Sequence, residues 1–276
     1  MIVQSAPEGD KSGKRYIMKL AEHLELVGQF AENYGNDRFA APEPREEFLY
    51  VCRWHDWGWR DLDENPPLNG ETGLPYNLVE TPLPVIFLTS ARSPEHNEAH
   101  HPYCGLIDSM HIWGLYNGRY GMSDKVLIDM VPEEHRMLAD SMLNNEHQRQ
   151  TRLKAELGAD AKTAAWVEEG TLFANYKVLQ FFDTFALYFN CTHAAARGEA
   201  VFTNVPLNRD TDATVTVRQV DSDTYSLDPY PFRESGLEVS YAGRYLAPMD
   251  AGANPDMAAI MRDTPTERQS ATLVAA

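Results

Sequence analysis

Four ionisable side chains occupy apolar surroundings in this sequence, although they lie far apart along the chain. They are His23, His55, Asp56 and Asp183. A buried carboxylate is unfavourable unless a partner compensates its charge. Imidazole nitrogens and carboxylate oxygens together suit a first-row divalent metal. The set therefore predicts a site for one or two divalent ions, such as Mn²⁺, Fe²⁺ or Mg²⁺.

Taken singly, these residues have plainer interpretations. Asp183 could be half of a buried salt bridge, and His23 could be a core histidine with one satisfied hydrogen bond. The adjacent pair His55-Asp56 changes the balance, because residues 48–59 are almost wholly apolar and aromatic. Burial of two neighbouring ionisable groups in such a segment calls for one common explanation, and metal binding supplies it.

The elements that must position these side chains are helices. Apolar residues at helical spacing, with suitable start and stop residues, predict helices at residues 20–34, 45–57, 103–116, 132–157 and 161–191. His23 and Asp183 both fall on apolar faces of their helices, and His55-Asp56 lies at the end of the second. Ligands that are remote in sequence are expected when helices converge on a core site.

The residue pattern changes after residue 198, where alternation of apolar and polar residues predicts short strands at 214–218, 224–227 and 237–241. We expect them to join a hairpin within residues 1–18. The predicted fold is mainly α, a helical bundle with a small antiparallel sheet (α+β overall). Its units are a helical metal-binding domain with the hairpin (1–197), a β-strand subdomain packed on it (198–248) and a loosely structured tail (249–276).

Charge and cysteine usage limit the partners. Asp plus Glu total 41 against 24 Lys plus Arg, a net charge of −17, which disfavours nucleic acid and anionic membranes. Three dispersed cysteines indicate a reducing compartment, and neither a signal peptide nor a spanning segment is evident. We therefore expect a cytoplasmic protein with a small, anionic substrate, and homo-oligomerisation is left open.

The order His23, His55-Asp56, Asp183 resembles the H…HD…D ligand order of the HD-domain superfamily of metal-dependent phosphohydrolases. More narrowly, the chain is similar to the DUF3891 family up to about residue 245. The stretches that carry this similarity are His23 with Gly28-Gln29, His55-Asp56-Trp57-Gly58-Trp59, Pro102 to Leu106, Ser109-Met110-His111, Gly114-Leu115-Tyr116, Leu179-Gln180 with Asp183, and Leu227 to Phe232. The resemblance implies an HD-like fold and a metal site rather than a known reaction.

The superfamily resemblance also implies roles for further residues. In its dinuclear members the Asp of the HD pair bridges two metals, and extra histidines hold the second metal. His111, on an inward helix face, fits that role. A second such ligand would come from a segment that otherwise reads as a solvated polar loop, which contains His96, His100 and His101.

Three residues are candidates for catalysis: Asp56, His111 and Arg119. Asp56 would orient or deprotonate the attacking water. Arg119 follows the third predicted helix and is the best-placed cation for an anionic substrate, with a plain surface arginine as the alternative. Tyr176 and Gln180 share a helix face with Asp183, so either could orient a ligand.

Three functions are consistent with this set. The first is a metal-dependent phosphohydrolase that acts on a small phosphoester or nucleotide through a metal-activated water. The second is a non-haem di-iron oxygenase, and the third is a metal-stabilised binding protein without catalysis. Four ligands leave open positions on an octahedral metal, as catalysis requires, which argues against the binding protein. We rank the hydrolase first, the oxygenase second and the binding protein third. Metal identity and count would separate the first two, and the substrate is not indicated.

Overall fold

The computed structural model describes residues 1–7, 9–250, 252 and 255–276. The helices are α1 (Leu20–Asn33), α2 (Arg45–Trp54), α3 (Arg60–Glu64), α4 (Leu83–His100), α5 (Pro102–Tyr116), α6 (Gly118–Gly121), α7 (Glu133–Ala159), α8 (Glu169–Cys191) and α9 (Met257–Asp263). Short 3₁₀ helices are η1 (Trp57–Trp59), η2 (Leu78–Glu80), η3 (Leu127–Met130), η4 (Ala164–Val167) and η5 (Ala194–Ala196). The strands are β1 (Ile2–Val3), β2 (Arg15–Met18), β3 (Leu68–Asn69), β4 (Leu74–Pro75), β5 (Ala200–Pro206), β6 (Asp212–Gln219), β7 (Thr224–Asp228), β8 (Leu237–Leu246) and β9 (Glu267–Ala275).

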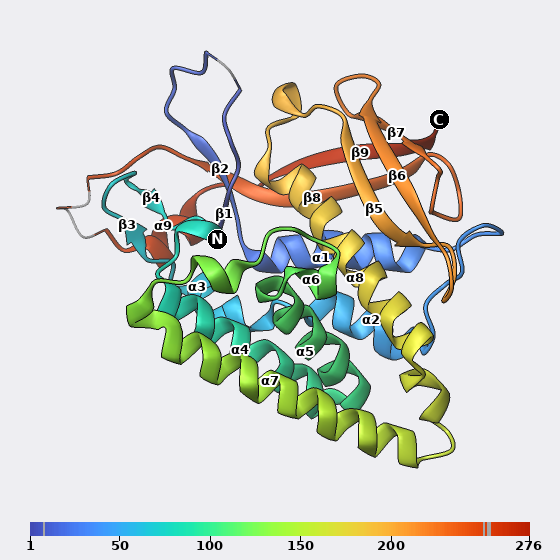
Figure 1. Cartoon of the computed structure of the whole chain (residues 1–276). Helices are drawn as coiled ribbons and strands as arrows, with labels where there is room; N and C mark the ends of the chain where they lie inside the picture. The colour runs from blue at the N-terminus through green and yellow to red at the C-terminus, as the bar shows by residue number, and fades with distance from the viewer. Residues whose placement is uncertain (8, 251, 253–254) are drawn as a thin grey trace.

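The elements form layers (Figure 1). A curled sheet covers one side, and α1 and α8 pack between it and the remaining long helices. The core between these layers is aromatic: the Phe30 ring of α1 stacks on Phe185 of α8 with centroids 4.7 Å apart. Both side chains are fully buried. The two central helices α1 and α8 therefore carry His23 and Asp183 into the interior.

The main sheet has seven strands in the order β1-β2-β8-β9-β7-β6-β5. All its pairings are antiparallel except β7 with β9. The β2–β8 pairing joins the N-terminal strands to the C-terminal ones. A separate two-stranded sheet is formed by β3 and β4.

The predicted fold class, a mainly helical HD-like bundle with a small sheet, is wrong. The chain is about 52% helical and 19% strand, and the seven-stranded sheet curls into a half-barrel that dominates one side of the molecule (Figure 1). The strands after residue 198 are longer than their alternating segments alone indicated. A further central strand also comes from a segment in which no strand was predicted.

That strand is β9, which lies in the tail that was expected to be loosely structured. It pairs with β8 on one side and β7 on the other, so it is central to the sheet. Its inward residues Ala271 and Leu273 are buried, but polar neighbours obscure the alternation in the sequence. The boundaries of the three predicted units stay a prediction.

Helix α4 was also missed, because no helix was predicted between residues 57 and 103 and the segment with His96, His100 and His101 was read as a polar loop. Its buried positions are mostly polar, including Thr89, Ser90, Ser93 and Asn97, so it lacks a clear apolar stripe. Pro94 inside the helix further weakens the helical signal. Of the helices in the described ranges, none is long and apolar enough to cross a membrane.

Candidate metal centre

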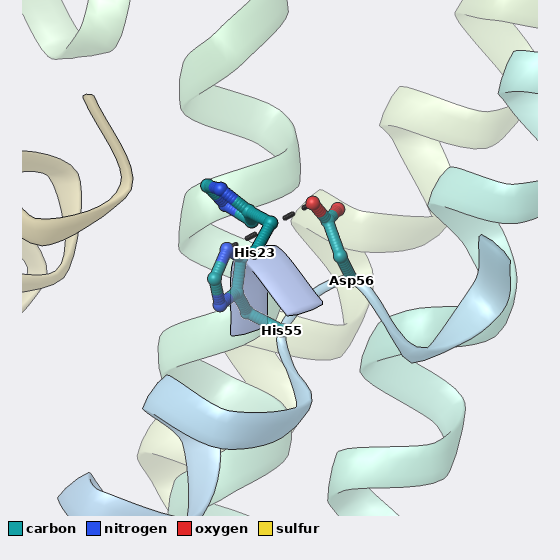
Figure 2. A group of neighbouring side chains, drawn as sticks. All are labelled: His23, His55 and Asp56. Atoms are coloured by element: carbon teal, nitrogen blue, oxygen red, sulfur yellow. Dashed lines mark ion pairs between the residues drawn. The ribbon is translucent and has the colours of Figure 1, made fainter. Parts of the chain in front are cut away.

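Three predicted ligands converge in the interior. His23 comes from α1, His55 follows the last residue of α2, and Asp56 precedes η1 (Figure 2). One potential ligand atom from each residue lies within 4.8 Å of the others. The His55 Nε2 to Asp56 Oδ2 distance is 3.9 Å. Atoms this close could bind one ion together.

The two imidazoles are oriented by partners on their other ring nitrogen. His23 Nδ1 lies 3.0 Å from the side-chain oxygen of Asn190, and His55 Nδ1 lies 3.1 Å from the carbonyl oxygen of Cys52. Both partners accept a hydrogen bond, so each Nδ1 donates and each neutral ring keeps the Nε2 lone pair free. Metal-binding histidines are typically held in this way.

Both Nε2 atoms are buried, and neither has a hydrogen-bond partner within the described part of the chain. A buried polar atom without a partner is costly and calls for an explanation. Two such lone pairs next to the Asp56 carboxylate fit a divalent cation, which would satisfy all three. The residues present therefore pass the chemical test for a metal.

Asp183 approaches the same place from α8. Its Oδ1 lies 3.3 Å from His23 Nε2, close enough for an ion pair but without hydrogen-bond geometry. Asp183 does not belong to the 4.8 Å set that His23, His55 and Asp56 form. Its carboxylate thus lies at the side of the cluster, next to His23.

His111 of α5 also adjoins the cluster, with its ring centroid 5.0 Å from that of His55. The Gln180 side-chain amide donates to His111 Nδ1 over 2.6 Å, which places the ring proton on Nε2. In this tautomer His111 offers an N–H rather than a lone pair. Its predicted role as a metal ligand stays a prediction, whereas a donor role agrees with the geometry.

Burial and neighbouring charges set the protonation states. Burial lowers the pKa of both His55 and His111 to about 4, so both rings are neutral at pH 7. Burial also lowers the pKa of His23, but Asp183, Asp56 and Asn190 more than offset this and raise it overall. Burial raises the pKa of Asp183, yet His23, His111 and His55 hold it below its usual range.

A buried carboxyl that the sequence analysis did not single out lies close by. Asp108 of α5 is fully buried, and its Oδ2 accepts a hydrogen bond from Asn97 over 2.7 Å. Burial and the nearby Asp56 raise its pKa well above the usual value. An acidic residue one turn before His111 in an apolar helix is the signal that could have found it.

The histidines proposed as further ligands have other partners. The His96 ring stacks on Trp57 at 4.2 Å, and the His100 ring stacks on Tyr50 at 3.5 Å. His101 Nδ1 accepts the backbone N–H of Tyr103 over 3.1 Å and so caps α5. Among the described residues, none of these three side chains belongs to the 4.8 Å set of His23, His55 and Asp56.

Arg119 lies in α6, in a left-handed backbone conformation with φ 51°. Within the ranges that the structure describes, no carboxylate lies within 4.0 Å of its guanidinium. Its charge contributes to the low pKa of His111. The structure thus places the predicted anion-binding cation beside the cluster.

Gly58 holds the turn that presents His55 and Asp56. Its N–H donates to Ser93 Oγ over 2.9 Å, and a Cβ at this position would overlap the carbonyl oxygen of Thr89 in α4. We expect Gly58→Ala to destabilise the protein by about 3 kcal/mol, because backbone rather than a flexible side chain must move. Urea unfolding measures this.

Gly158→Ala is the matched control for that substitution. Gly158 lies near the end of α7, where a Cβ meets only Val167 Cγ2 at 3.7 Å. We expect it to be neutral or to stabilise the protein by about 0.5 kcal/mol. Equal stability of the two variants would show that the close approach at Gly58 is not needed.

Comparison with known proteins identifies a family without a described activity. The family model described as "Protein of unknown function (DUF3891)" matches residues 1–248. Neither the curated proteins nor the solved structures contain a match to the chain. Because the matched region includes every residue of the candidate centre and all but the last elements of the fold, the chain belongs to the DUF3891 family.

Proposed function

We propose that this protein is a metal-dependent hydrolase that acts on a small phosphoester or nucleotide, with its metal held by His23, His55, Asp56 and Asp183. The observation that supports this most is the pair of buried Nε2 atoms of His23 and His55, which make no hydrogen bond among the described residues and lie beside the Asp56 carboxylate. The same order of ligand types is found in the HD-domain superfamily, and kinship with that superfamily is part of the proposal.

The chemistry of the donor set favours catalysis. A bound divalent metal polarises a phosphoryl oxygen and lowers the pKa of a coordinated water. Two histidines and two carboxylates leave open positions on an octahedral ion, whereas a structural site is normally closed by protein ligands.

The chain's own residues would then bind and move protons. Burial raises the pKa of Asp56 toward neutral pH, which makes its carboxylate a better proton acceptor. His111 offers its Nε2–H for a hydrogen bond to substrate. Arg119 supplies a positive charge for a phosphoryl group.

The di-iron oxygenase has less support. It needs two further histidines for a second iron. Among the described residues, His111 lies next to His55, whereas His96 and His100 stack on Trp57 and Tyr50 and His101 caps α5. A non-catalytic metal protein is the other alternative, and activity measurements separate it from the hydrolase.

The test is a comparison of activities with defined metals. Metal-depleted protein would be reloaded separately with Mn²⁺, Fe²⁺ and Mg²⁺, and phosphate release would be measured from a panel of phosphomonoesters and nucleotides. Oxygen consumption would be recorded in parallel. We expect phosphate release that requires metal. Oxygen consumption without phosphate release would favour the oxygenase, and a folded, metal-loaded protein inactive in both assays would contradict the proposal.

Metal affinity should depend on pH through His23. Its pKa is raised above 6.5, so below that raised value the ring is protonated and a metal must displace the proton. Each unit of pH below it should lower the affinity about tenfold, whereas His55, with a pKa of about 4, is already neutral. Calorimetric titration with Mn²⁺ in two buffers of different ionisation heat would count the protons released. Affinity that does not change between about pH 6 and pH 8 would contradict this expectation.

A further inference from the structure

A small pocket lies between α6, α8 and β5, next to the candidate metal centre. Its volume is about 130 Å³, and its polar lining consists of Arg119, Lys177, Gln180, Thr184, Thr203 and Asn204. Pockets that enclose a whole small molecule measure roughly 300–1,000 Å³, so this one has room for a single chemical group.

The pocket is positively charged, although the protein carries a net charge of −17. Arg119 is half-buried, and within the described ranges no carboxylate neutralises it at ion-pair distance. Lys177 is 8% exposed and pairs with Asp212 over 2.5 Å, which leaves two of its ammonium protons for another acceptor. A half-buried guanidinium without a counter-ion favours an anionic ligand.

The backbone around the pocket is strained at two lining positions. Arg119 and Asn204 have φ values of 51° and 59°, in the left-handed region that non-glycine residues seldom adopt. Asn204 also lies where the β5–β6 register shifts, between Phe202 and Val205. Strained residues and bulges concentrate at functional sites, where they direct a side chain. Here both of them belong to the same pocket.

The pocket connects to the metal centre through α8. Gln180 lines the pocket and also bonds to His111, while Thr184 directly follows Asp183. Tyr176, one turn before Gln180, lies close enough to Arg119 and Asp183 for both charges to act on its pKa. The Tyr176 hydroxyl and Gln180 Oε1 are buried without partners in the described part of the chain. Unsatisfied polar atoms thus extend from the centre to the pocket.

We propose that this pocket binds a phosphate group of the substrate, with Arg119, Lys177 and the Asn204 amide as hydrogen-bond donors. This inference deepens the proposed function and rests on it, because only the proposed function makes the bound phosphate group part of a substrate. The three donors come from α6, α8 and β5, which suits a tetrahedral anion with several oxygens better than a flat carboxylate. Binding of phosphate itself does not require the metal.

The test is a titration of inorganic phosphate into metal-depleted protein in the presence of a chelator, with binding monitored by phosphorus NMR or calorimetry. We expect the wild type to bind and Arg119→Gln to bind about 10- to 100-fold more weakly, as loss of a charged hydrogen bond implies. Arg136→Gln is the matched control, because Arg136 lines a different surface hollow that it shares with Glu133 and Asp140.

Asn204→Gly provides a second variant in case Arg119→Gln does not fold. Glycine adopts the positive φ at this position without strain and removes only the amide, so we expect a retained fold and about 3- to 10-fold weaker binding. Equal phosphate affinity in the wild type and both folded variants would overturn the proposal. Phosphate binding that appears only with metal would overturn it too.

These outcomes are distinguishable from failure of the proposed function. If no phosphoester is hydrolysed but the metal-free wild type binds phosphate through Arg119, the phosphate pocket is supported and the hydrolase proposal is contradicted. If hydrolysis is found but Arg119→Gln binds phosphate normally, the hydrolase stands and the phosphate pocket falls.

Discussion

Replacing Asp183 with asparagine is expected to lower the affinity for a divalent metal by more than about 100-fold, because even residues that only orient metal ligands typically contribute 10- to 100-fold. Asp183 remains ionised at neutral pH and lies 3.3 Å from His23 Nε2. The substitution keeps the shape but removes the negative charge that favours a cation. Calorimetric titration with Mn²⁺ measures the change in metal affinity.

Asp63→Asn is a suitable control for this experiment. Asp63 is also a buried aspartate, but both its oxygens accept backbone N–H groups at the start of α1, from Leu20 and Ala21, at 2.9 Å each. Its replacement should cost about 1 kcal/mol of stability and leave metal affinity nearly unchanged. If Asp183→Asn binds metal as tightly as this control, Asp183 is not a ligand.

Replacing Asp56 with asparagine should lower the rate of hydrolysis at saturating metal by about 10²- to 10⁴-fold, the usual contribution of a positioned proton acceptor. The amide can still offer an oxygen to a cation but accepts no proton. Turnover should therefore fall more than metal occupancy. Phosphate release, with the metal content of each sample measured, separates the two effects.

Asp61→Asn is the control for the second prediction, since Asp61 is an exposed carboxylate on α3 that pairs with Arg92 over 2.8 Å. It should leave the rate unchanged. A metal-loaded Asp56→Asn protein that hydrolyses substrate at the wild-type rate would show that the proton acceptor is another group.

The convergence of the cluster could be predicted from sequence because its helices have clear apolar faces. Helices α1 and α8 bury long runs of hydrophobic side chains, and an ionisable residue on such a face must point inward with them. His23 and Asp183 are therefore inward-facing by periodicity alone. His55 and Asp56 could be located because their neighbours are almost wholly apolar and aromatic.

The fold as a whole could not be predicted in this way. Helix α4 buries hydroxyl and amide side chains, so its period is not visible as hydrophobicity. Strand β9 is recognisable only from its pairing with β7 and β8, which are distant in sequence. The partners that orient the two imidazoles, Asn190 and the Cys52 carbonyl, likewise depend on three-dimensional packing.

The pocket beside the centre illustrates the same limit. Arg119 was recognisable as a candidate cation, but nothing near it in sequence indicated Lys177 or Asn204 as neighbours. Only the packing of α6 against α8 and β5 brings them together. Functional residues on one face of a helix can therefore be predicted from sequence. A site formed between helices and a strand can be recognised only in the structure.

The central claim, that His23 and His55 bind a metal through their Nε2 atoms, is tested most directly by elemental analysis of purified protein. Wild type would be compared with His55→Gln and with His101→Gln, whose histidine caps α5 instead. We expect about one ion or more per chain in the wild type and in His101→Gln, and almost none in His55→Gln with its fold retained. Equal metal content in the wild type and His55→Gln, or none in the wild type, would contradict the metal centre.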